Sequence, residues 1–144
     1  MKRFRLLPVL VLSMLLSGAL APAQVIGRLV ADVPFAFHAG QAKFPPGRYV
    51  LRMEEGSDLT TMEISSADGT HSALFEVRDA QAPRPPKHGE LIFNHVGGRY
   101  FLAKVFDDGV KNGSALVDTG YSKKYGAGLT SGEQKHVPII HSNS

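Results

Sequence analysis

The sequence predicts an all-β domain, either a small antiparallel sandwich or a partly closed barrel, with six or seven short strands in hairpin order. Three observations support this prediction. Apolar and polar residues alternate with a period of two, as on strands that bury one face. Turn-forming residues recur about every eight to twelve positions, and the 144 residues include 15 Gly and 9 Pro. Two of the turns also set a hairpin register that places apolar residues opposite one another.

Residues Met1–Ala23 have the features of a secretory signal peptide. Three of the first five residues are basic, an apolar run follows at Leu6–Leu20, and Ala21-Pro22-Ala23 forms a small-x-small cleavage site before Gln24. The apolar run is about 15 residues long, which is below the ~20 that a membrane-spanning helix needs. We therefore expect cleavage, a periplasmic or extracellular protein, and no stable membrane span afterwards.

Cleavage changes the charge balance of the chain. The full sequence has 16 Lys+Arg and 13 Asp+Glu, a formal net charge of +3. The leader contains three of the basic residues and no acidic one, so the 121 residues from Gln24 onward have no formal net charge. Nucleic acid is therefore not an expected partner. The sequence has no Cys, which excludes disulfides, thiolate metal sites and a cysteine nucleophile.

The first strand is expected from Ile26 to Phe37, with Val33, Phe35 and Phe37 on one face. Pro34 has no N–H to donate, so this strand should lie at a sheet edge or bend there.

A turn at Phe44-Pro45-Pro46-Gly47 precedes the next predicted strand. This strand places Tyr49, Leu51 and Met53 on one face, and Glu55-Gly56-Ser57-Asp58 closes its hairpin.

Asp68-Gly69 fits a two-residue type I′ turn, because both central positions of that turn need positive φ. Counting outward from the turn gives one apolar face and one mostly polar face. The predicted pairs are Ile64 with Ala73, Met62 with Phe75, Thr60 with Val77, Ser65 with Ser72, and Thr61 with Glu76.

Asp79–His88 contains three prolines and is predicted to be a partly extended connection. Gly97-Gly98 then forms a second two-residue turn, and its hairpin has apolar residues on both faces. We expect this hairpin to be central and covered on both sides. The predicted pairs are His95 with Tyr100, Phe93 with Leu102, Leu91 with Lys104, Asn94 with Phe101, Ile92 with Ala103, and Glu90 with Val105.

The pattern weakens after the turn predicted at Asp107-Asp108-Gly109. Ala115-Leu116-Val117 is expected as a last short strand and Ser122–Tyr125 as one helical turn. Gly126–Ser144 is polar and contains glycine, which predicts a flexible tail. The expected organisation is a signal peptide at 1–23, a single β domain at 24–125 and the tail at 126–144.

Two motifs resemble a group of small exported bacterial proteins of unknown function. These are Val33-Pro34-Phe35-Ala36-Phe37, which matches the group's V-P-F-x-F pattern, and Phe44-Pro45-Pro46-Gly47-Arg48-Tyr49, which resembles its L-P-A-G-x-Y pattern with Phe for Leu and Pro for Ala. The resemblance extends over Val30–Phe106 and ends where the group tends toward a charged helical ending. It implies export and a β-rich domain, and it supplies no activity to transfer.

Asp118 is the one candidate catalytic residue. Asp118-Thr119-Gly120 follows two apolar residues and resembles the active-site loop of retroviral-type aspartic proteases, in which two aspartates share a proton. The polar stretch after the motif lacks the flap and second half of that family, and Tyr121 stands where the family favours a small residue. A turn after a short strand is the preferred interpretation.

Other candidate residues also have structural explanations. The histidines have no metal-ligand spacing, and His95 is expected to pair with Tyr100 across the second hairpin. Asp107-Asp108-Gly109 offers too few ligands for a dedicated calcium site. The aromatic residues are expected to fill the core rather than form a sugar-binding surface. The histidines are His38, His71, His88, His95, His136 and His141; the aromatic residues are Phe35, Phe37, Tyr49, Phe75, Phe93, Tyr100 and Phe101.

The sequence therefore favours an exported, non-enzymatic binding or structural module of the cell envelope or exterior. Its expected partner is an envelope or extracellular protein or glycan. No catalytic, cofactor-binding or metal-binding residue is assigned, and no cofactor is expected. Two alternatives remain: a small aspartic-type hydrolase that uses Asp118, and a carbohydrate-binding module that uses exposed Tyr residues.

Overall fold

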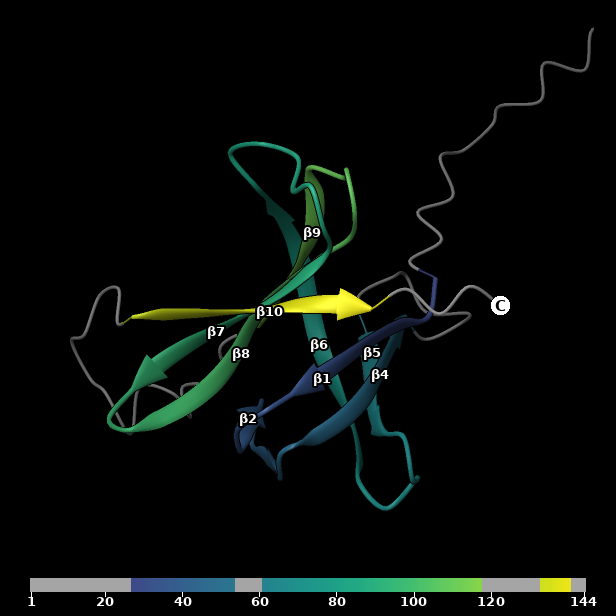
Figure 1. Cartoon of the computed structure of the whole chain (residues 1–144), viewed down its shortest axis with the longest axis vertical. Helices are drawn as coiled ribbons and strands as arrows, with labels where there is room; N and C mark the ends of the chain where they lie inside the picture. Colours follow the sequence, from purple (N-terminus) through teal and green to yellow (C-terminus); the bar gives the residue numbers. More distant parts are fainter. Residues whose placement is uncertain (1–26, 54–60, 118–132, 141–144) are drawn as a thin grey trace, which may run out of the picture.

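The computed structural model describes residues 27–53, 61–117 and 133–140, and these residues contain ten strands (Figure 1). The strands are β1 (Leu29–Val33), β2 (Phe37–Ala39), β3 (Ala42–Phe44), β4 (Gly47–Met53), β5 (Thr61–Ser66), β6 (Ser72–Gln81), β7 (Glu90–Val96), β8 (Arg99–Phe106), β9 (Asn112–Leu116) and β10 (Gln134–Ile140). Within these three ranges there is no helix long and apolar enough to span a membrane.

Eight of the strands close into a barrel. Hydrogen bonding connects them in the order β8-β7-β10-β1-β4-β5-β6-β9, and β9 pairs back onto β8 at Val105 and Ser114. Neighbouring strands in the barrel are antiparallel, whereas β2 adds to β8 in parallel and carries β3 at its outer edge. The all-β prediction is confirmed. The barrel is closed rather than partly closed, and it has more strands than the six or seven predicted.

The barrel encloses an apolar core to which each of the eight barrel strands contributes. Phe37 of β2 joins this core and contacts Phe44, Tyr49 and Phe93, with ring centroids 5.1–5.2 Å apart. Such edge-on and offset aromatic contacts add to the stability that apolar burial provides. The fully buried side chains of largest volume are Tyr49, Phe37, Phe44, Phe93, Leu29, Leu51, Met62, Ile64, Leu91 and Val33.

Pro34 divides the first predicted strand into two. β1 ends at Val33 and β2 begins at Phe37, so the chain bends at the proline, as predicted. Val33 and Phe37 are both buried in the core, and Phe35 packs against the core between them. The bend moves the chain from the barrel wall at β1 to the edge of β8, where β2 pairs with Tyr100 and Phe101.

The β5–β6 hairpin has the predicted register. Met62 pairs with Phe75 and Ile64 with Ala73, while Thr60 lies outside the described residues. The predicted type I′ turn is wrong: the Gly69 N–H donates to the Ser66 carbonyl at 2.9 Å, and the Ser66 N–H donates to the His71 carbonyl at 2.7 Å, which closes a four-residue loop at residues 67–70. This loop and a two-residue turn at 68–69 are centred on the same point, so they give the same pairing.

The β7–β8 hairpin follows the prediction near its turn. Gly97 and Gly98 have φ of 57° and 75°, the conformation that a type I′ turn requires. The predicted pairs of His95, Asn94 and Phe93 are all present.

Farther from the turn, a β-bulge between Ile92 and Phe93 shifts the β7–β8 pairing by one residue, so the predicted pairs there are wrong. The predicted register placed Leu91 opposite the charged Lys104. The bulge places it opposite Val105, and both apolar side chains are buried in the core. The observed pairs are Ile92 with Lys104, Leu91 with Val105, and Glu90 with Phe106.

β6 and β9 are longer than predicted. β6 continues through Gln81 into the segment expected to be a connection, because β9 pairs with it from Val77 to Gln81. β9 begins at Asn112, ahead of the predicted Ala115. The proline-containing connection is therefore shorter and starts after this ladder.

The expected C-terminal tail is wrong for Gln134–Ile140, which form β10. This strand lies between β7 and β1 and buries Val137 and Ile139 in the core (Figure 1). From His136 to Ile140, exposed residues alternate with these two buried ones, as on a strand with one solvent-facing side. The signal peptide at 1–23, the helical turn predicted at 122–125, and residues 126–132 and 141–144 of the tail lie outside the described residues.

Candidate functional site

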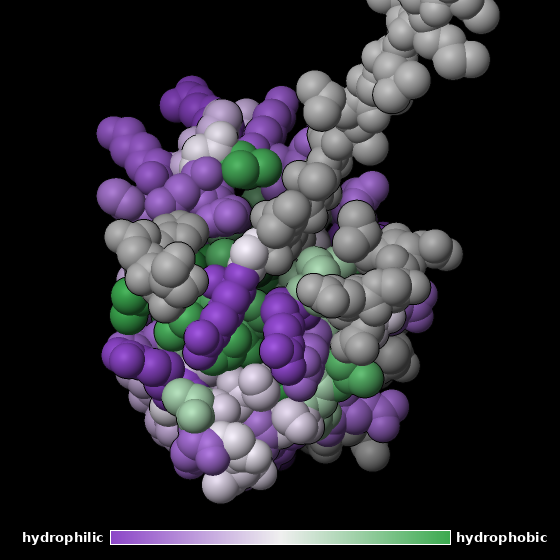
Figure 2. Space-filling model, turned by 90° about the vertical axis from the view of Figure 1, so that its right-hand side faces the viewer, coloured by the Kyte–Doolittle hydropathy of each residue, from purple (hydrophilic) through white to green (hydrophobic). Residues whose placement is uncertain are grey.

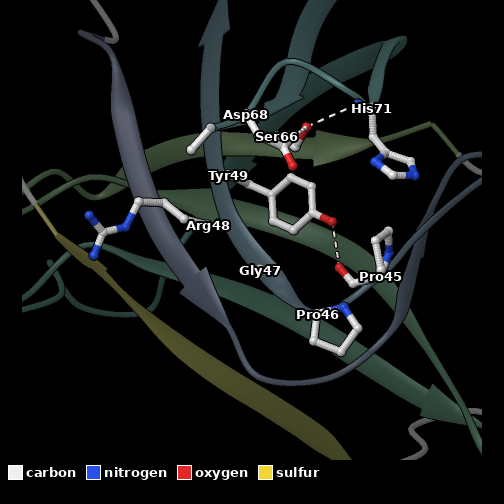
Figure 3. Close-up of a pocket in the computed structure, with 9 residues that line it drawn as sticks. Pro45, Pro46, Gly47, Arg48, Tyr49, Ser66, Asp68 and His71 are labelled. Atoms are coloured by element: carbon white, nitrogen blue, oxygen red, sulfur yellow. Dashed lines mark hydrogen bonds between the residues drawn. The ribbon is translucent and has the colours of Figure 1, made fainter.

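Two neighbouring turns enclose a surface hollow of about 200 Å³ (Figure 3). One turn joins β3 to β4 and contains Pro45 and Pro46, and the other is the β5–β6 loop. Tyr49, the third residue of β4, lies between the two turns in Figure 3. The lining residues are Pro45, Pro46, Gly47, Arg48, Tyr49, Ser66, Ala67, Asp68 and His71.

The Asp68 carboxylate organises the β5–β6 side of the hollow. Its Oδ1 accepts hydrogen bonds from the Ser66 hydroxyl at 2.6 Å, the Thr70 amide at 3.0 Å and the Thr70 hydroxyl at 2.7 Å. These bonds, that of Ser66 first, lower the pKa of Asp68 to about 2, and the neighbouring His71 acts in the same direction. Its Oδ2 accepts no hydrogen bond from the described residues.

The two hydroxyl residues of this loop also contact His71. The Thr70 hydroxyl donates to Asp68, and its oxygen also lies 2.9 Å from His71 Nδ1. Either atom of that contact can donate, depending on the tautomer of His71. Ser66 likewise donates its single hydroxyl proton to Asp68 and accepts from the His71 amide at 2.9 Å.

Tyr49 and the two prolines form the opposite side of the hollow. The Tyr49 hydroxyl donates to the Pro45 carbonyl, and this bond is drawn in Figure 3. Burial raises the pKa of Tyr49, and the negative charge of Asp68 raises it further, so the phenol keeps its proton. Pro45 and Pro46 have no backbone N–H. This side therefore offers few hydrogen-bond donors to a ligand.

Arg48 lines the hollow, but its guanidinium is directed away from it. Its guanidinium forms two hydrogen bonds with Asp32, at 2.7 and 3.0 Å. This bidentate pair lowers the pKa of Asp32, and Figure 3 shows the Arg48 side chain directed away from Tyr49. The positive charge of Arg48 is therefore paired with Asp32, which does not line the hollow.

The hollow contains Ser, His and Asp side chains, but their connections differ from those of a hydrolase triad. A nucleophilic serine gives its proton to an imidazole, which a carboxylate orients. Here Ser66 donates to Asp68, and the His71 imidazole bonds to Thr70. The arrangement therefore activates no nucleophile. It presents a fixed carboxylate oxygen and an imidazole nitrogen beside an apolar proline surface.

Comparison with known proteins identified no match: no family model, no curated protein and no solved structure corresponds to this chain.

Asp118, the candidate for aspartic chemistry, lies outside the described residues, as does His141. The other histidines are dispersed over the barrel. His38 stacks on Phe101 with centroids 5.1 Å apart, and burial lowers its pKa. His136 Nδ1 lies 2.9 Å from Glu90 Oε2. Among the described residues, no three His, Cys, Asp or Glu side chains gather into a possible metal site.

His95 and Tyr100 form the cross-strand pair that the sequence predicted, and their rings stack with centroids 4.4 Å apart. Phe35 also stacks on Tyr100, at 4.1 Å, and meets Phe93 edge-on at 5.0 Å. Tyr49 is only 1% exposed. Core packing therefore accounts for both tyrosines in the described part of the barrel, and neither ring is an open sugar-stacking surface.

Asp107-Asp108-Gly109 forms the predicted turn. Asp108 accepts a hydrogen bond from the Gly89 amide, and the Gly109 amide donates to the Pro86 carbonyl at 2.8 Å. These bonds join the turn before β9 to the proline-containing connection. The Asp108 carboxylate therefore has a structural role here.

Large exposed apolar side chains are scattered over the described residues. They are Leu74 on β6, Val110 before β9 and Ile140 at the end of β10. On the face drawn in Figure 2, hydrophilic side chains lie across the hydrophobic area. Scattered apolar residues of this kind are ordinary for a protein surface.

Sequence reasoning missed the hollow because it treated both of its turns only as chain reversals. One usable signal was present: Ser66 and Thr70 flank Asp68 at two positions on either side. Hydroxyl residues at this spacing can donate to an Asp side chain in a turn.

Proposed function

We propose that the protein is an exported, non-enzymatic binding or structural module of the cell envelope or cell exterior, and that it binds through its outer surface. One observation supports this most directly. The polar groups that converge at the hollow donate their hydroxyl protons to Asp68 and Pro45, which organises a surface without activating a nucleophile. The apolar core inside the barrel supports the same proposal, because it leaves recognition to the exterior.

Export is supported by the leader pattern of Met1–Ala23 and by the resemblance to small exported bacterial proteins. The expected partner is a protein or glycan of the envelope or exterior. No formal net charge remains after cleavage, which makes broad electrostatic attraction to nucleic acid a poor basis for recognition.

Export can be tested by expressing the full chain with a C-terminal tag in a secreting bacterium. We expect the tagged protein in the periplasmic or extracellular fraction, with an amino terminus at Gln24. A Leu12→Arg variant, which interrupts the apolar run, should remain in the cell at full length. Exported protein that begins at Met1 would contradict the proposed leader.

The absence of catalysis can be tested at Asp118. We expect purified protein and its Asp118→Asn variant to behave identically in peptide-hydrolysis assays from pH 3 to pH 7. A peptidase with an acidic optimum that the substitution abolishes would overturn the non-enzymatic proposal.

A further inference from the structure

We propose that the hollow between the β3–β4 turn and the β5–β6 loop binds one cationic group, the guanidinium or ammonium at the end of an Arg or Lys side chain. This inference rests on the proposed function and deepens it by naming the chemistry of recognition. The ligand group would lie against Asp68 Oδ2, with Pro45 and Pro46 beside its apolar stem. The same chemistry is present in a peptide side chain and in a free amine, and the experiment below separates the two.

The size of the hollow favours a single side-chain end. Sites for drug-sized ligands usually enclose roughly 300–1,000 Å³. This hollow measures about 200 Å³ and is open to solvent (Figure 3). It can therefore hold one functional group and part of an alkyl stem, with the rest of the partner outside.

The hydrogen-bonding groups of the hollow favour a ligand that only donates. The hydroxyl protons of Tyr49 and Ser66 are already given to acceptors in the protein, and the Ala67 amide donates to the Arg48 carbonyl at 2.8 Å. Pro45 and Pro46 supply no N–H. Asp68 Oδ2 remains as an acceptor, because the three donors of the loop all bond to Oδ1. Ammonium and guanidinium groups have donors and no acceptor, so they complement this set.

The charges of the hollow favour the same class of ligand. Asp68 is fixed by three hydrogen bonds from its own loop, so binding a cation requires little reorganisation of the carboxylate. The competing cation Arg48 is held by Asp32. An anionic ligand would instead be repelled by the Asp68 carboxylate. The hydroxyls of Tyr49 and Ser66 could not compensate, because they already donate to acceptors in the protein.

The test is an NMR titration of the ¹⁵N-labelled protein with the peptide Ac-Gly-Arg-Gly-NH₂ at low salt and neutral pH. The matched neutral probe is the same peptide with citrulline in place of arginine. We expect saturable shifts at the amides of Gly47, Tyr49, Ala67 and Gly69 with the arginine peptide alone. One exposed charge pair contributes little, so we expect a dissociation constant on the order of a few millimolar.

The charge requirement can be tested with two matched variants. Asp68→Asn removes the charge and keeps an oxygen that can accept the bonds of Ser66 and Thr70, so the loop should be retained. It should weaken binding at least fivefold, whereas Asp79→Asn on β6 should change it less than twofold. Equal binding of the citrulline peptide, equal loss in both variants, or no saturable shift would overturn the inference.

Methylguanidinium separates the two possible sources of the cation. Tighter binding of the arginine peptide than of methylguanidinium assigns the hollow to a peptide side chain, and equal binding assigns it to a small free cation. Both results support cation recognition. Failure of every titration would remove the inference but leave the proposed function standing, because export and the absence of catalysis are measured separately.

Discussion

Asp68 shows how one turn residue can stabilise a fold through its ionisation state. Three donors converge on its Oδ1, which lowers its pKa to about 2 in the folded protein, against about 3.9 in an unfolded chain. A lowered pKa means that the ionised form stabilises the fold. This contribution is present above about pH 4 and is lost as the pH falls toward 2.

We therefore predict that acid destabilises the protein partly through Asp68. Carboxyl ¹³C NMR should show Asp68 titrating well below the usual pKa of an aspartate, at about 2. Between pH 5 and pH 2.5, the melting temperature of the wild-type protein should fall further than that of Asp68→Asn, which has no carboxyl to protonate. Titration of Asp68 near pH 4 would contradict the assignment of its three donors.

The loss of the Phe93 ring should destabilise the core more than the loss of the Phe75 ring. It is 0% exposed and contacts both Phe35 and Phe37, whereas Phe75 is 8% exposed. We predict that Phe93→Ala lowers the free energy of unfolding by ~3–5 kcal/mol, with a smaller loss for Phe75→Ala. Urea denaturation measures the free energy of unfolding of both variants. The control is Leu74→Ala, at a residue 61% exposed, which should change that free energy by less than ~0.5 kcal/mol. A larger loss for Phe75→Ala would reverse the predicted order.

At the level of elements, β10 is the strand that completes the barrel wall. It pairs with β7 from Gln134 to Pro138 and with β1 at Ile139 and Ile140. Bonds beyond the ladder hold it as well: the His95 amide donates to the Glu133 carbonyl at 2.9 Å, and His136 contacts Glu90. Removing such a strand would expose the edges of both neighbours.

We predict that deleting residues 133–144 destabilises the protein more than Phe93→Ala does. The milder pair Val137→Ala and Ile140→Ala tests the same strand without truncation, because Val137 is buried and Ile140 is 46% exposed. Val137→Ala should cost about 1–3 kcal/mol, from lost methyl burial and the space left behind. Equal, small effects of both substitutions would show that the C-terminal segment is dispensable for stability.

The elements that the sequence predicted well are those whose pairing is local. Gly97-Gly98 determines the pairs close to it because the strands on either side must continue from the turn. The bulge at Ile92 was not predictable from turn geometry, since it depends on where Leu91 meets the core. The same limit applies to the hollow, which forms only when the Pro45 turn and the Asp68 loop, far apart in sequence, are brought together.

β10 escaped prediction for a related reason. Val137 and Ile139 are only two apolar positions in a polar stretch, and Pro138 between them argues against a central strand. Pro138 is tolerated because it is exposed and stands at the end of the β7 ladder, opposite Glu90. The partners of β10 come from β1 and β7, and no local pattern indicates such distant pairing.

On the scale of the whole molecule, barrel closure joins the most distant parts of the described chain. The β7–β8 hairpin closes within a few residues, whereas β1 pairs with β10 through Val30 and Ile140. Contacts between residues far apart in sequence form slowly, because the chain must first lose the entropy of a long loop.

We predict that β10 docks after the folding transition state. Val137→Ala should then speed unfolding and leave refolding nearly unchanged, whereas Phe93→Ala, in the β7–β8 hairpin, should also slow refolding. Stopped-flow kinetics over a range of urea concentrations separates the two effects. A refolding rate that falls in proportion to the stability lost in Val137→Ala would show that β10 docks early.

If the protein is exported as proposed, its chain crosses a membrane through a narrow channel, and the pairing of Val30 with Ile140 then determines when the barrel can close. A channel that takes the amino end first releases β1 early, yet β1 then lacks one of its two neighbours. That neighbour emerges last of the described strands, so the barrel cannot close around a half-transported chain. In an exported chain, this strand order would keep the polypeptide threadable during passage and delay closure until arrival, because the barrel closes only when β10 is present.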